Sequence, residues 1–366
     1  MADAQVRSSV IVPWLSVLRG FAALAVVMVH TGQQFSSDPM IGRLQPVTDL
    51  GKHGVAVFFV LSAYLLTPQL TAVGRTTSEL RGYIIRRFWR IAPAYYVCLL
   101  LLVILHRYPL SDLLSHLLFI FNFSDRSFGA INYPFWSIAV EVSFYVLLPL
   151  LIWTIDMQKR VRLCAALMVI SVIWQAGSGI ARQLGSFDIT LDWSARLYLL
   201  SAIPAFLLGM LASSGELERS SRALSAVRIA AGAAMLDVAV RALIIVGLPL
   251  TSLSSNLDNA MHGSIGYLAY GSLGVLFIRG AEQPGWRDRV SHRYPFLVSV
   301  GNASFSLYLW HLPVLTFVAV RQTPALRLLL AYALLAVVVA ASYRFIERPG
   351  IRVGRLLESG RRGSLT

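Results

Sequence analysis

The stretch LSVLRGFAALAVVMVH, from Leu15 to His30, is apolar enough to form a membrane-spanning helix, yet it carries two ionisable side chains. Arg19 lies near its start and His30 at its end. A helix turns by about 100° per residue, so a spacing of eleven residues places both side chains within roughly 20° of one face. At about 1.5 Å per residue they are roughly 16 Å apart along the axis, which is about half of a bilayer core. Ionisable residues in a membrane span are costly, so the pair indicates a polar path entered from one side.

A structural role is the alternative for each of these residues taken alone. Arg19 can extend its guanidinium group to the cytoplasmic headgroups. His30 can be an ordinary polar residue at the outer end of a span. The rest of the sequence has to decide between the two interpretations.

The composition is typical of a membrane protein with many spans. Of the 366 residues, 56% are hydrophobic and only 14% are charged, and the mean hydropathy is +0.65. A soluble protein of this length needs far more charge on its surface. The net charge of +14 therefore indicates basic cytoplasmic loops that face anionic lipid, and no nucleic-acid partner is expected. The two cysteines lie in apolar runs without a disulfide or zinc-type spacing, and no metal is expected.

Ten apolar segments are long enough to span a bilayer, which predicts an all-α transmembrane bundle. The expected spans are residues 11–32, 53–71, 92–107, 134–155, 163–180, 195–213, 227–248, 261–279, 297–320 and 325–346. Residues 110–123 are apolar and are a candidate re-entrant or interfacial helix. With the N-terminus inside, every inner loop is basic and the outer loop 249–260 has no Lys or Arg, so both termini are expected in the cytoplasm. The prediction is one transmembrane domain over 1–350 and a basic cytoplasmic tail over 351–366.

Three arginines lie close together in YIIRRFWRIAPAYY, residues 83–96, at the expected inner surface. Arg87 and Arg90 are three residues apart and share a helix face, with Arg86 adjacent. A positive-inside anchor would account for the charge alone. Guanidinium groups also bind phosphate through two parallel hydrogen bonds, so the cluster is a candidate site for a nucleotide-bearing cytosolic ligand. Pro93 is expected to fix the start of the third span.

Glu141 lies about two turns inside the fourth apolar helix, in NYPFWSIAVEVSFYVLLP, residues 132–149. A buried carboxylate without a basic neighbour on its own helix needs a partner from another helix or must be protonated. The predicted topology places Glu141 and His30 in the outer half of the membrane. A pair of these two would orient the imidazole and raise its basicity, which makes them the candidate catalytic constellation.

Several other polar residues in apolar segments have a structural interpretation. Ser62, in the second span, is expected to bond back to its own helix. Asp237 and Arg241 are four residues apart and can neutralise each other. Glu347 and Arg348, followed by a proline, indicate a helix stop and a charge pair. Glu347 is equally a candidate to hold the arginine cluster of the third span in place.

The segment VGNASFSLYLWHLPV, residues 300–314, contains a second intramembrane histidine. His311 lies deep in the segment, and Tyr308 lies about one turn before it. Asn302 is a polar position near its start. These side chains either bond across helices or line a cavity.

Six blocks, taken together and in order, resemble the acyltransferase 3 family of integral-membrane O-acyltransferases. They are LRGFAALAVVMVH, GVAVFFVLSAYLL, RRFWRIAPAYY, PFWSIAVEVSFYVLLP, GNASFSLYLWHLPV and SYRFIERP. The resemblance runs from about Leu15 to Pro349. Two positions depart from the family's pattern: Ala63, where the family usually has Gly, and Val142, where it often has a second Glu.

The resemblance implies transfer of an acyl group, usually acetyl, from cytosolic acyl-CoA to a hydroxyl of a carbohydrate, glycolipid or glycosylated metabolite, in a bacterial inner membrane. The family's Arg-to-His motif falls on Arg19 and His30, its Arg-x-x-Arg motif on Arg87 and Arg90, and its conserved Glu on Glu141. The residues expected to be catalytic are therefore His30, Glu141 and Arg19, those expected to bind acyl-CoA are Arg86, Arg87 and Arg90, and the candidate substrate or oxyanion contacts are Ser62, Asn302, Tyr308 and His311.

The competing function is a membrane transporter or flippase that uses the intramembrane Arg, His and Glu as a polar relay. It predicts inverted repeats or paired helices broken by Gly or Pro, and the sequence has no clear pair. A membrane-embedded sensor or scaffold would leave the shared face of Arg19 and His30 unexplained.

Overall fold

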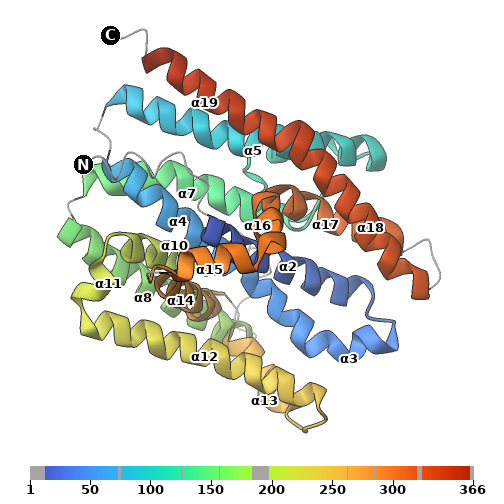
Figure 1. The fold of residues 1–366 in the computed structure, drawn as a ribbon. Helices are drawn as coiled ribbons and strands as arrows, with labels where there is room; N and C mark the ends of the chain where they lie inside the picture. Colours follow the sequence, from blue (N-terminus) through green and yellow to red (C-terminus); the bar gives the residue numbers. More distant parts are fainter. Residues whose placement is uncertain are drawn as a thin grey trace. The chain divides into compact units, whose positions relative to one another are not determined.

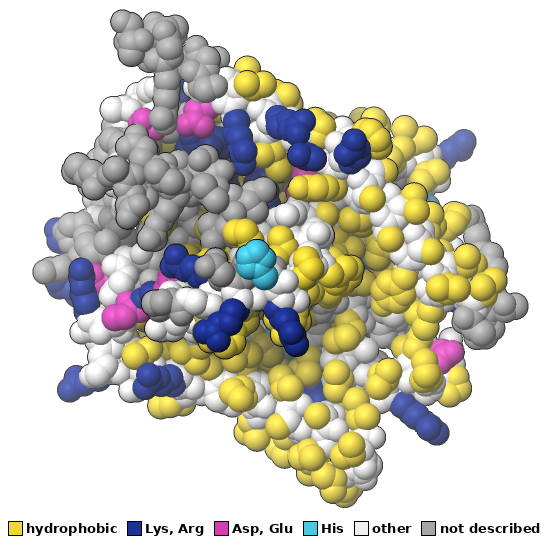
Figure 2. All heavy atoms as spheres, in the orientation of Figure 1, with side chains coloured by type: hydrophobic (Ala, Val, Ile, Leu, Met, Phe, Trp, Pro, Cys, Tyr) yellow, Lys and Arg dark blue, Asp and Glu magenta, His cyan; other side chains and the backbone are white. Residues whose placement is uncertain are grey.

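The computed structural model describes residues 13–72, 76–124, 127–155, 157–183, 198–261, 263–283, 285–319 and 324–362. Throughout these ranges the regular secondary structure is helical, without a β-strand (Figure 1). The all-α prediction is therefore confirmed. Hydrophobic side chains make up much of the surface that Figure 2 shows. Large apolar side chains that are exposed include Ile104 at 65% and Leu105 at 70%. An apolar exterior is what a multi-pass protein presents to lipid.

Six segments of the described chain have the length and composition of membrane spans: Pro13–Gln34, Pro39–Ala72, Thr77–His106, Phe135–Thr154, Ser221–Ile245 and Leu326–Glu358. Each overlaps a predicted span. Three shorter apolar helices overlap three more: Val161–Gln175, Leu199–Ser213 and Ser304–Ala319. The helix Ser264–Ala281 overlaps the remaining one. The number of crossings and the side of the termini stay predictions, because these segments qualify as spans by length and composition only.

The chain divides into two compact units, which the sequence did not predict. Unit 1 comprises residues 1–72 and 150–302, and unit 2 comprises residues 73–149 and 303–366. The helices of unit 1 are α2 (Pro13–Gln34), α3 (Pro39–Thr48), η1 (Asp49–His53), α4 (Gly54–Ala72), α8 (Met157–Gln183), α10 (Tyr198–Ser213), α11 (Glu216–Arg219), α12 (Ser221–Ile245), α13 (Thr251–Ala260), α14 (Ser264–Ala281), α15 (Trp286–Arg293) and α16 (Pro295–Asn302).

Unit 2 is built from the helices that come before and after residues 150–302, the second segment of unit 1. They are α5 (Thr77–His106), α6 (Leu110–Leu117), η2 (Phe121–Phe123), α17 (Ser304–Ala319), α18 (Pro324–Ser342), η3 (Tyr343–Glu347) and α19 (Arg348–Arg362). Helix α7 (Phe135–Thr154) begins in unit 2 and ends in unit 1. The short helix α6 lies in the apolar stretch at 110–123 that was a candidate additional helix.

Close approach between backbones holds α2 against α16 in unit 1. A Cβ atom at Gly20 would lie 2.5 Å from the carbonyl oxygen of Leu297, and one at Gly301 would collide with the carbonyl oxygen of Ser16. In lipid, small residues at such contacts allow helices to pack closely. Arg19, next to Gly20, is therefore held on a tightly fixed part of α2.

Prolines within the helices leave backbone carbonyls free to accept hydrogen bonds from other parts of the chain. A proline has no N–H, so the carbonyl four residues earlier loses its partner within the helix. In α7, Pro149 releases the carbonyl of Tyr145, which accepts a hydrogen bond from the Tyr83 hydroxyl of α5 at 3.0 Å. In unit 1, Pro204 releases the carbonyl of Leu200, which accepts from the Ser171 hydroxyl at 2.6 Å. In unit 2, Pro313 releases the carbonyl of Leu309, which accepts from the Asn132 side-chain amide at 3.1 Å. Pairing these carbonyls is what a membrane interior demands.

Pro93 does not start a helix, so that prediction was wrong. Helix α5 runs from Thr77 to His106 with Pro93 inside it. The carbonyl of Trp89, four residues earlier, lies close to Gly350 of α19, where a Cβ atom would be 2.9 Å from that oxygen. The proline is accommodated because α19 packs along α5 at this point (Figure 1).

Glu347 does not stop the last helix either. The chain continues from α18 through the π-helical turn η3 into α19. The N–H of Arg348 bonds the carbonyl of Tyr343, five residues earlier. A π-turn changes the register of the backbone hydrogen bonds, which lets the helix continue past Pro349. The predicted tail at 351–366 is therefore helical as far as Arg362.

Candidate functional site

Arg19 and His30 lie on one uninterrupted helix, α2, and both are half-buried. The Nδ1 atom of His30 is 2.9 Å from the carbonyl oxygen of Val26. A carbonyl oxygen only accepts hydrogen bonds, so Nδ1 carries the hydrogen in the neutral ring and the lone pair is on Nε2. This tautomer is the one that can take a proton from a substrate hydroxyl through Nε2.

Glu141 lies on α7 in unit 2, next to Tyr145 rather than alone. Its carboxylate accepts a hydrogen bond from the Tyr145 hydroxyl, four residues along the same helix. The guanidinium carbon of Arg87, on α5, is 5.8 Å from the centroid of the same tyrosine ring, which is within cation–π range. Glu141 and Arg87 were predicted at different depths, whereas in the structure both contact the Tyr145 side chain.

The three arginines of α5 have different surroundings. Arg86 forms an ion pair with Glu358 of α19, a carboxylate that the sequence analysis did not consider. Arg87 has a buried Nε atom without a hydrogen-bond partner in the part of the chain that the structure describes. Arg90 is half-buried. The cluster therefore contains one arginine that is already paired and one with unused donor capacity.

Glu347 fastens α17 within unit 2. Glu347 is 1% exposed. Its Oε2 atom accepts from the backbone N–H of Ser306 at 3.1 Å and from the Ser306 hydroxyl at 2.7 Å. The Ser342 hydroxyl donates to the Ser306 oxygen at 3.1 Å. The helix dipole of α17 also favours a carboxylate that contacts the first turn of this helix, as that of Glu347 does. Glu347 thus has a clear structural role at this helix start.

Tyr308 and His311 lie one turn apart on α17, as expected, with different partners. The Tyr308 hydroxyl donates to the carbonyl of Pro134 at 2.9 Å and lies 2.7 Å from the hydroxyl of Ser137 on α7. His311 is fully buried, with Nδ1 at 2.8 Å from the carbonyl oxygen of Tyr308. Tyr308 therefore bonds across helices, and His311 bonds to its own helix.

Asn302 and Ser62 belong to unit 1. The Oδ1 atom of Asn302 accepts from the Ser16 hydroxyl at 2.9 Å, which joins the end of α16 to α2 one turn before Arg19. Ser62 is half-buried in the middle of α4. Among the described residues, no group of three or more His, Cys, Asp or Glu side chains is arranged to hold a metal ion.

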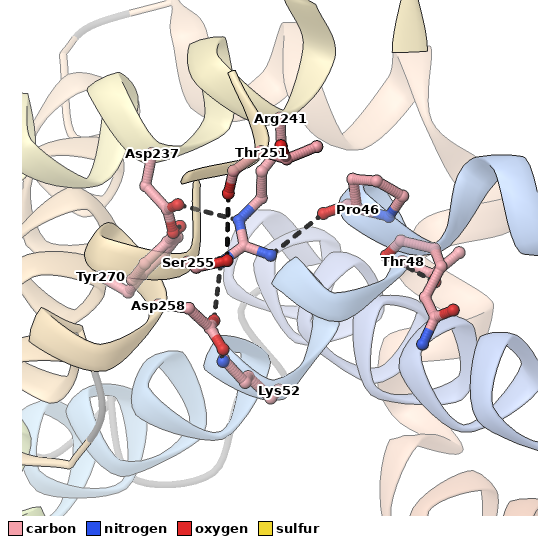
Figure 3. A network of polar contacts seen from close by, with 10 residues as sticks. Pro46, Thr48, Lys52, Asp237, Arg241, Thr251, Ser255, Asp258 and Tyr270 are labelled. Atoms are coloured by element: carbon pink, nitrogen blue, oxygen red, sulfur yellow. Dashed lines mark hydrogen bonds and ion pairs between the residues drawn. The ribbon is translucent and has the colours of Figure 1, made fainter. Parts of the chain in front are cut away.

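The predicted pair of Asp237 and Arg241 is present on α12, with Nε 2.8 Å from Oδ1 and exposures of 0% and 3%. It belongs to a larger network (Figure 3). Arg241 also donates to Asp258 of α13 at 2.6 Å and to the carbonyl of Pro46 in α3 at 3.2 Å. The spacing on one helix predicted the pair, but the partners from α13 and α3 come from distant segments and were not predicted.

The predicted site residues fall into two groups. Arg19, His30, Ser62 and Asn302 are in unit 1, whereas the α5 arginines, Glu141, Tyr308 and His311 are in unit 2. The pairing of His30 with Glu141 would join residues of different units, and it stays a prediction.

Comparison with known proteins gives one family. The acyltransferase domain of the acyltransferase 3 family matches residues 12–346. The chain is 26% identical over 374 residues to the peptidoglycan O-acetyltransferase OatA of Listeria monocytogenes, covering 92% of this chain and 55% of that protein. It is 25% identical over 368 residues to the O-acetyltransferase OatA of Staphylococcus aureus, covering 92% and 57%. The chain thus spans little more than half the length of these curated relatives. No solved structure matches it.

Proposed function

Because the chain belongs to the acyltransferase 3 family, we propose that it transfers an acyl group, acetyl in the first instance, from cytosolic acyl-CoA to a hydroxyl of a carbohydrate, glycolipid or glycosylated metabolite. The observation that carries the proposal is the match of the acyltransferase domain to residues 12–346. Two relatives named O-acetyltransferases support acetyl as the group and oxygen as the acceptor atom. The bacterial inner membrane is the proposed location.

The donor's phosphates are proposed to bind the arginines of α5. Coenzyme A carries a diphosphate and a 3′-phosphate, and guanidinium groups bind phosphate oxygens through paired hydrogen bonds. A buried N–H without a partner is costly, and the Nε atom of Arg87 is such a donor within the described residues. A phosphate oxygen would satisfy it. Arg90 shares the face, and Arg86 is adjacent but already paired with Glu358.

His30 is the proposed general base. Its Nε2 atom takes the proton from the acceptor hydroxyl while the hydroxyl oxygen attacks the thioester carbonyl. The new carbon–oxygen bond forms, the carbon–sulfur bond breaks, and the thiolate leaves with the electron pair and takes up the proton. Glu141 would orient the imidazole, and Arg19 would guide the pantetheine arm. A route through an acylated His30 is the alternative order of steps.

The negative charge on the thioester oxygen needs a hydrogen-bond donor. Ser62, Asn302 and Tyr308 are the candidates from the sequence, with His311 as a further contact. Tyr308 already donates to the Pro134 carbonyl, so it would have to exchange that bond. Substitution of each by a residue without the polar group, followed by single-turnover kinetics, would identify the one that lowers the rate of transfer.

Thermal unfolding with and without acetyl-CoA tests the donor site. We expect acetyl-CoA to stabilise the wild-type protein and to have no effect on the Arg87→Gln, Arg90→Gln double variant. The matched control is Arg219→Gln, which removes an exposed arginine of an ion pair on α11 and should retain the stabilisation. Folded wild-type protein that no acyl-CoA stabilises would contradict the donor assignment and favour the transporter alternative.

A further inference from the structure

A charged network in unit 1 extends from buried residues to the surface (Figure 3). At its buried end, Asp237 accepts from Arg241 at 2.8 Å and from the Tyr270 hydroxyl of α14 at 2.7 Å. At its surface end, Asp258 of α13 pairs with Lys52 of η1. The side chains of Asp237 and Arg241 are 0% and 3% exposed, whereas those of Lys52 and Asp258 are 32% and 44% exposed. The outer pair is therefore open to a ligand.

The outer pair has hydrogen-bonding capacity left over. Lys52 and Arg241 both bind the Oδ1 atom of Asp258, and neither of these two bonds uses its Oδ2 atom. Lys52 has three N–H donors and uses one of them on Asp258. Burial alone would raise the pKa of Asp258, but the hydrogen bonds from Lys52 and Arg241 outweigh it and hold the pKa below its usual value. Asp258 is thus a fixed, ionised carboxylate with an accepting oxygen.

The outer pair lies at the end of unit 1 that carries His30. Helix α3 and η1 follow α2 in the sequence and pack back against it. A Cβ atom at Gly51 of η1 would lie 3.0 Å from the side chain of Val29, the residue before His30. Lys52 is the residue after Gly51. The Lys52–Asp258 pair is therefore beside the segment of α2 that carries the proposed base.

The helix that carries Asp258 is rich in small neutral polar groups. Its exposed polar side chains are Thr251, Ser252, Ser255 and Asn256. These hydroxyl and amide groups both donate and accept hydrogen bonds. The surface suits a neutral ligand with several hydroxyl groups better than a phosphate or an extended apolar ligand.

We propose that Lys52 and Asp258 form a subsite that binds a saccharide acceptor through two neighbouring hydroxyl groups. One hydroxyl donates to Oδ2 of Asp258, and the next accepts from an N–H of Lys52. The buried Asp237–Arg241 pair is a positioning pair that fixes Asp258. This inference rests on the proposed function and adds to it the residues and atoms that hold the acceptor.

Saccharide binding without an acyl donor tests the subsite separately from catalysis. The probe is the disaccharide of N-acetylglucosamine and N-acetylmuramic acid, titrated into the full chain in lipid nanodiscs free of glycoside detergent. We expect binding to the wild-type protein and about tenfold weaker binding to Asp258→Asn, equivalent to about 1.4 kcal/mol. Lys52→Gln should weaken binding similarly. Thermal unfolding verifies that both variants are folded.

Glu216→Gln is the matched control, because Glu216 belongs to an ion pair with Arg219 elsewhere in unit 1, and it should bind the disaccharide as the wild type does. Wild-type protein that binds no disaccharide, or folded Asp258→Asn and Lys52→Gln variants that bind it normally, would overturn the subsite. The proposed function would fail by a different result, namely folded wild-type protein that no acyl-CoA stabilises.

Discussion

The hydroxyl of Tyr145 donates to the carboxylate of Glu141, one turn earlier on α7. The ring of Tyr145 also lies 5.8 Å from the guanidinium carbon of Arg87. One tyrosine thus contacts both the carboxylate proposed to orient the base and an arginine proposed to bind the donor. Occupation of the arginines by a phosphate and the position of Glu141 are therefore physically connected within unit 2.

Replacing Tyr145 by Phe should lower kcat about tenfold, which corresponds to about 1.4 kcal/mol of transition-state stabilisation. The substitution removes the hydrogen bond to Glu141 but keeps a ring for Arg87. The KM for acetyl-CoA should therefore change little. Steady-state kinetics with varied acetyl-CoA measures both constants.

Tyr83→Phe is the control for this prediction. Tyr83 is 1% exposed, and its hydroxyl bonds the Tyr145 carbonyl that Pro149 releases. The variant should lose about 1 kcal/mol of stability while its kcat stays as in the wild type. A kcat that falls equally in both variants would mean that Tyr145 only supports the fold.

Gly301→Ala should destabilise unit 1 by about 1–3 kcal/mol, the usual cost of inserting an extra methyl group into a packed contact. The new Cβ atom would collide with the carbonyl oxygen of Ser16 and force α16 away from α2. Thermal unfolding measures the change. Gly232→Ala in α12 is the control, because no heavy atom lies within 4 Å of a Cβ at that position, and it should leave stability unchanged or raise it. Equal melting temperatures for the two variants would exclude the tight α2–α16 contact.

The buried histidine of α6 should make stability depend on pH. His116 is fully buried, its ring stacks on Phe121 at 4.0 Å, and its Nε2 has no hydrogen-bond partner among the described residues. Burial lowers the pKa of His116 below its usual value and outweighs the opposing effects of the Asp112 carbonyl and carboxylate. The unfolded chain therefore binds this proton at higher pH than the folded chain does.

The stability due to neutral His116 is fully present above the unfolded pKa of about 6.5 and is lost as the pH falls through the folded pKa. Melting temperatures measured between about pH 8 and about pH 5 should fall less in His116→Gln than in the wild type. Parallel curves for the two proteins would refute the assignment.

Local sequence patterns predicted the helices and the contacts within them. The apolar run of α2 and the four-residue spacing of Asp237 and Arg241 depend on helix geometry alone, and both are present. Contacts set by tertiary packing were missed. Asp258 reaches Arg241 only because α13 turns back on α12, and Pro93 stays inside a helix because α19 packs beside it. Both contacts of Tyr145 could have been predicted from its spacing, since it is four residues after Glu141 and four before Pro149.

The most direct test of the central claim is acyl transfer by His30→Ala. Wild-type protein and the variant, in proteoliposomes, would receive labelled acetyl-CoA and the disaccharide of N-acetylglucosamine and N-acetylmuramic acid, and the O-acetylated product would be quantified. We predict product from the wild type and none above background from the variant, with the two proteins equally stable and equally stabilised by acetyl-CoA. Transfer at the wild-type rate by the folded variant would contradict the role of His30 as the base.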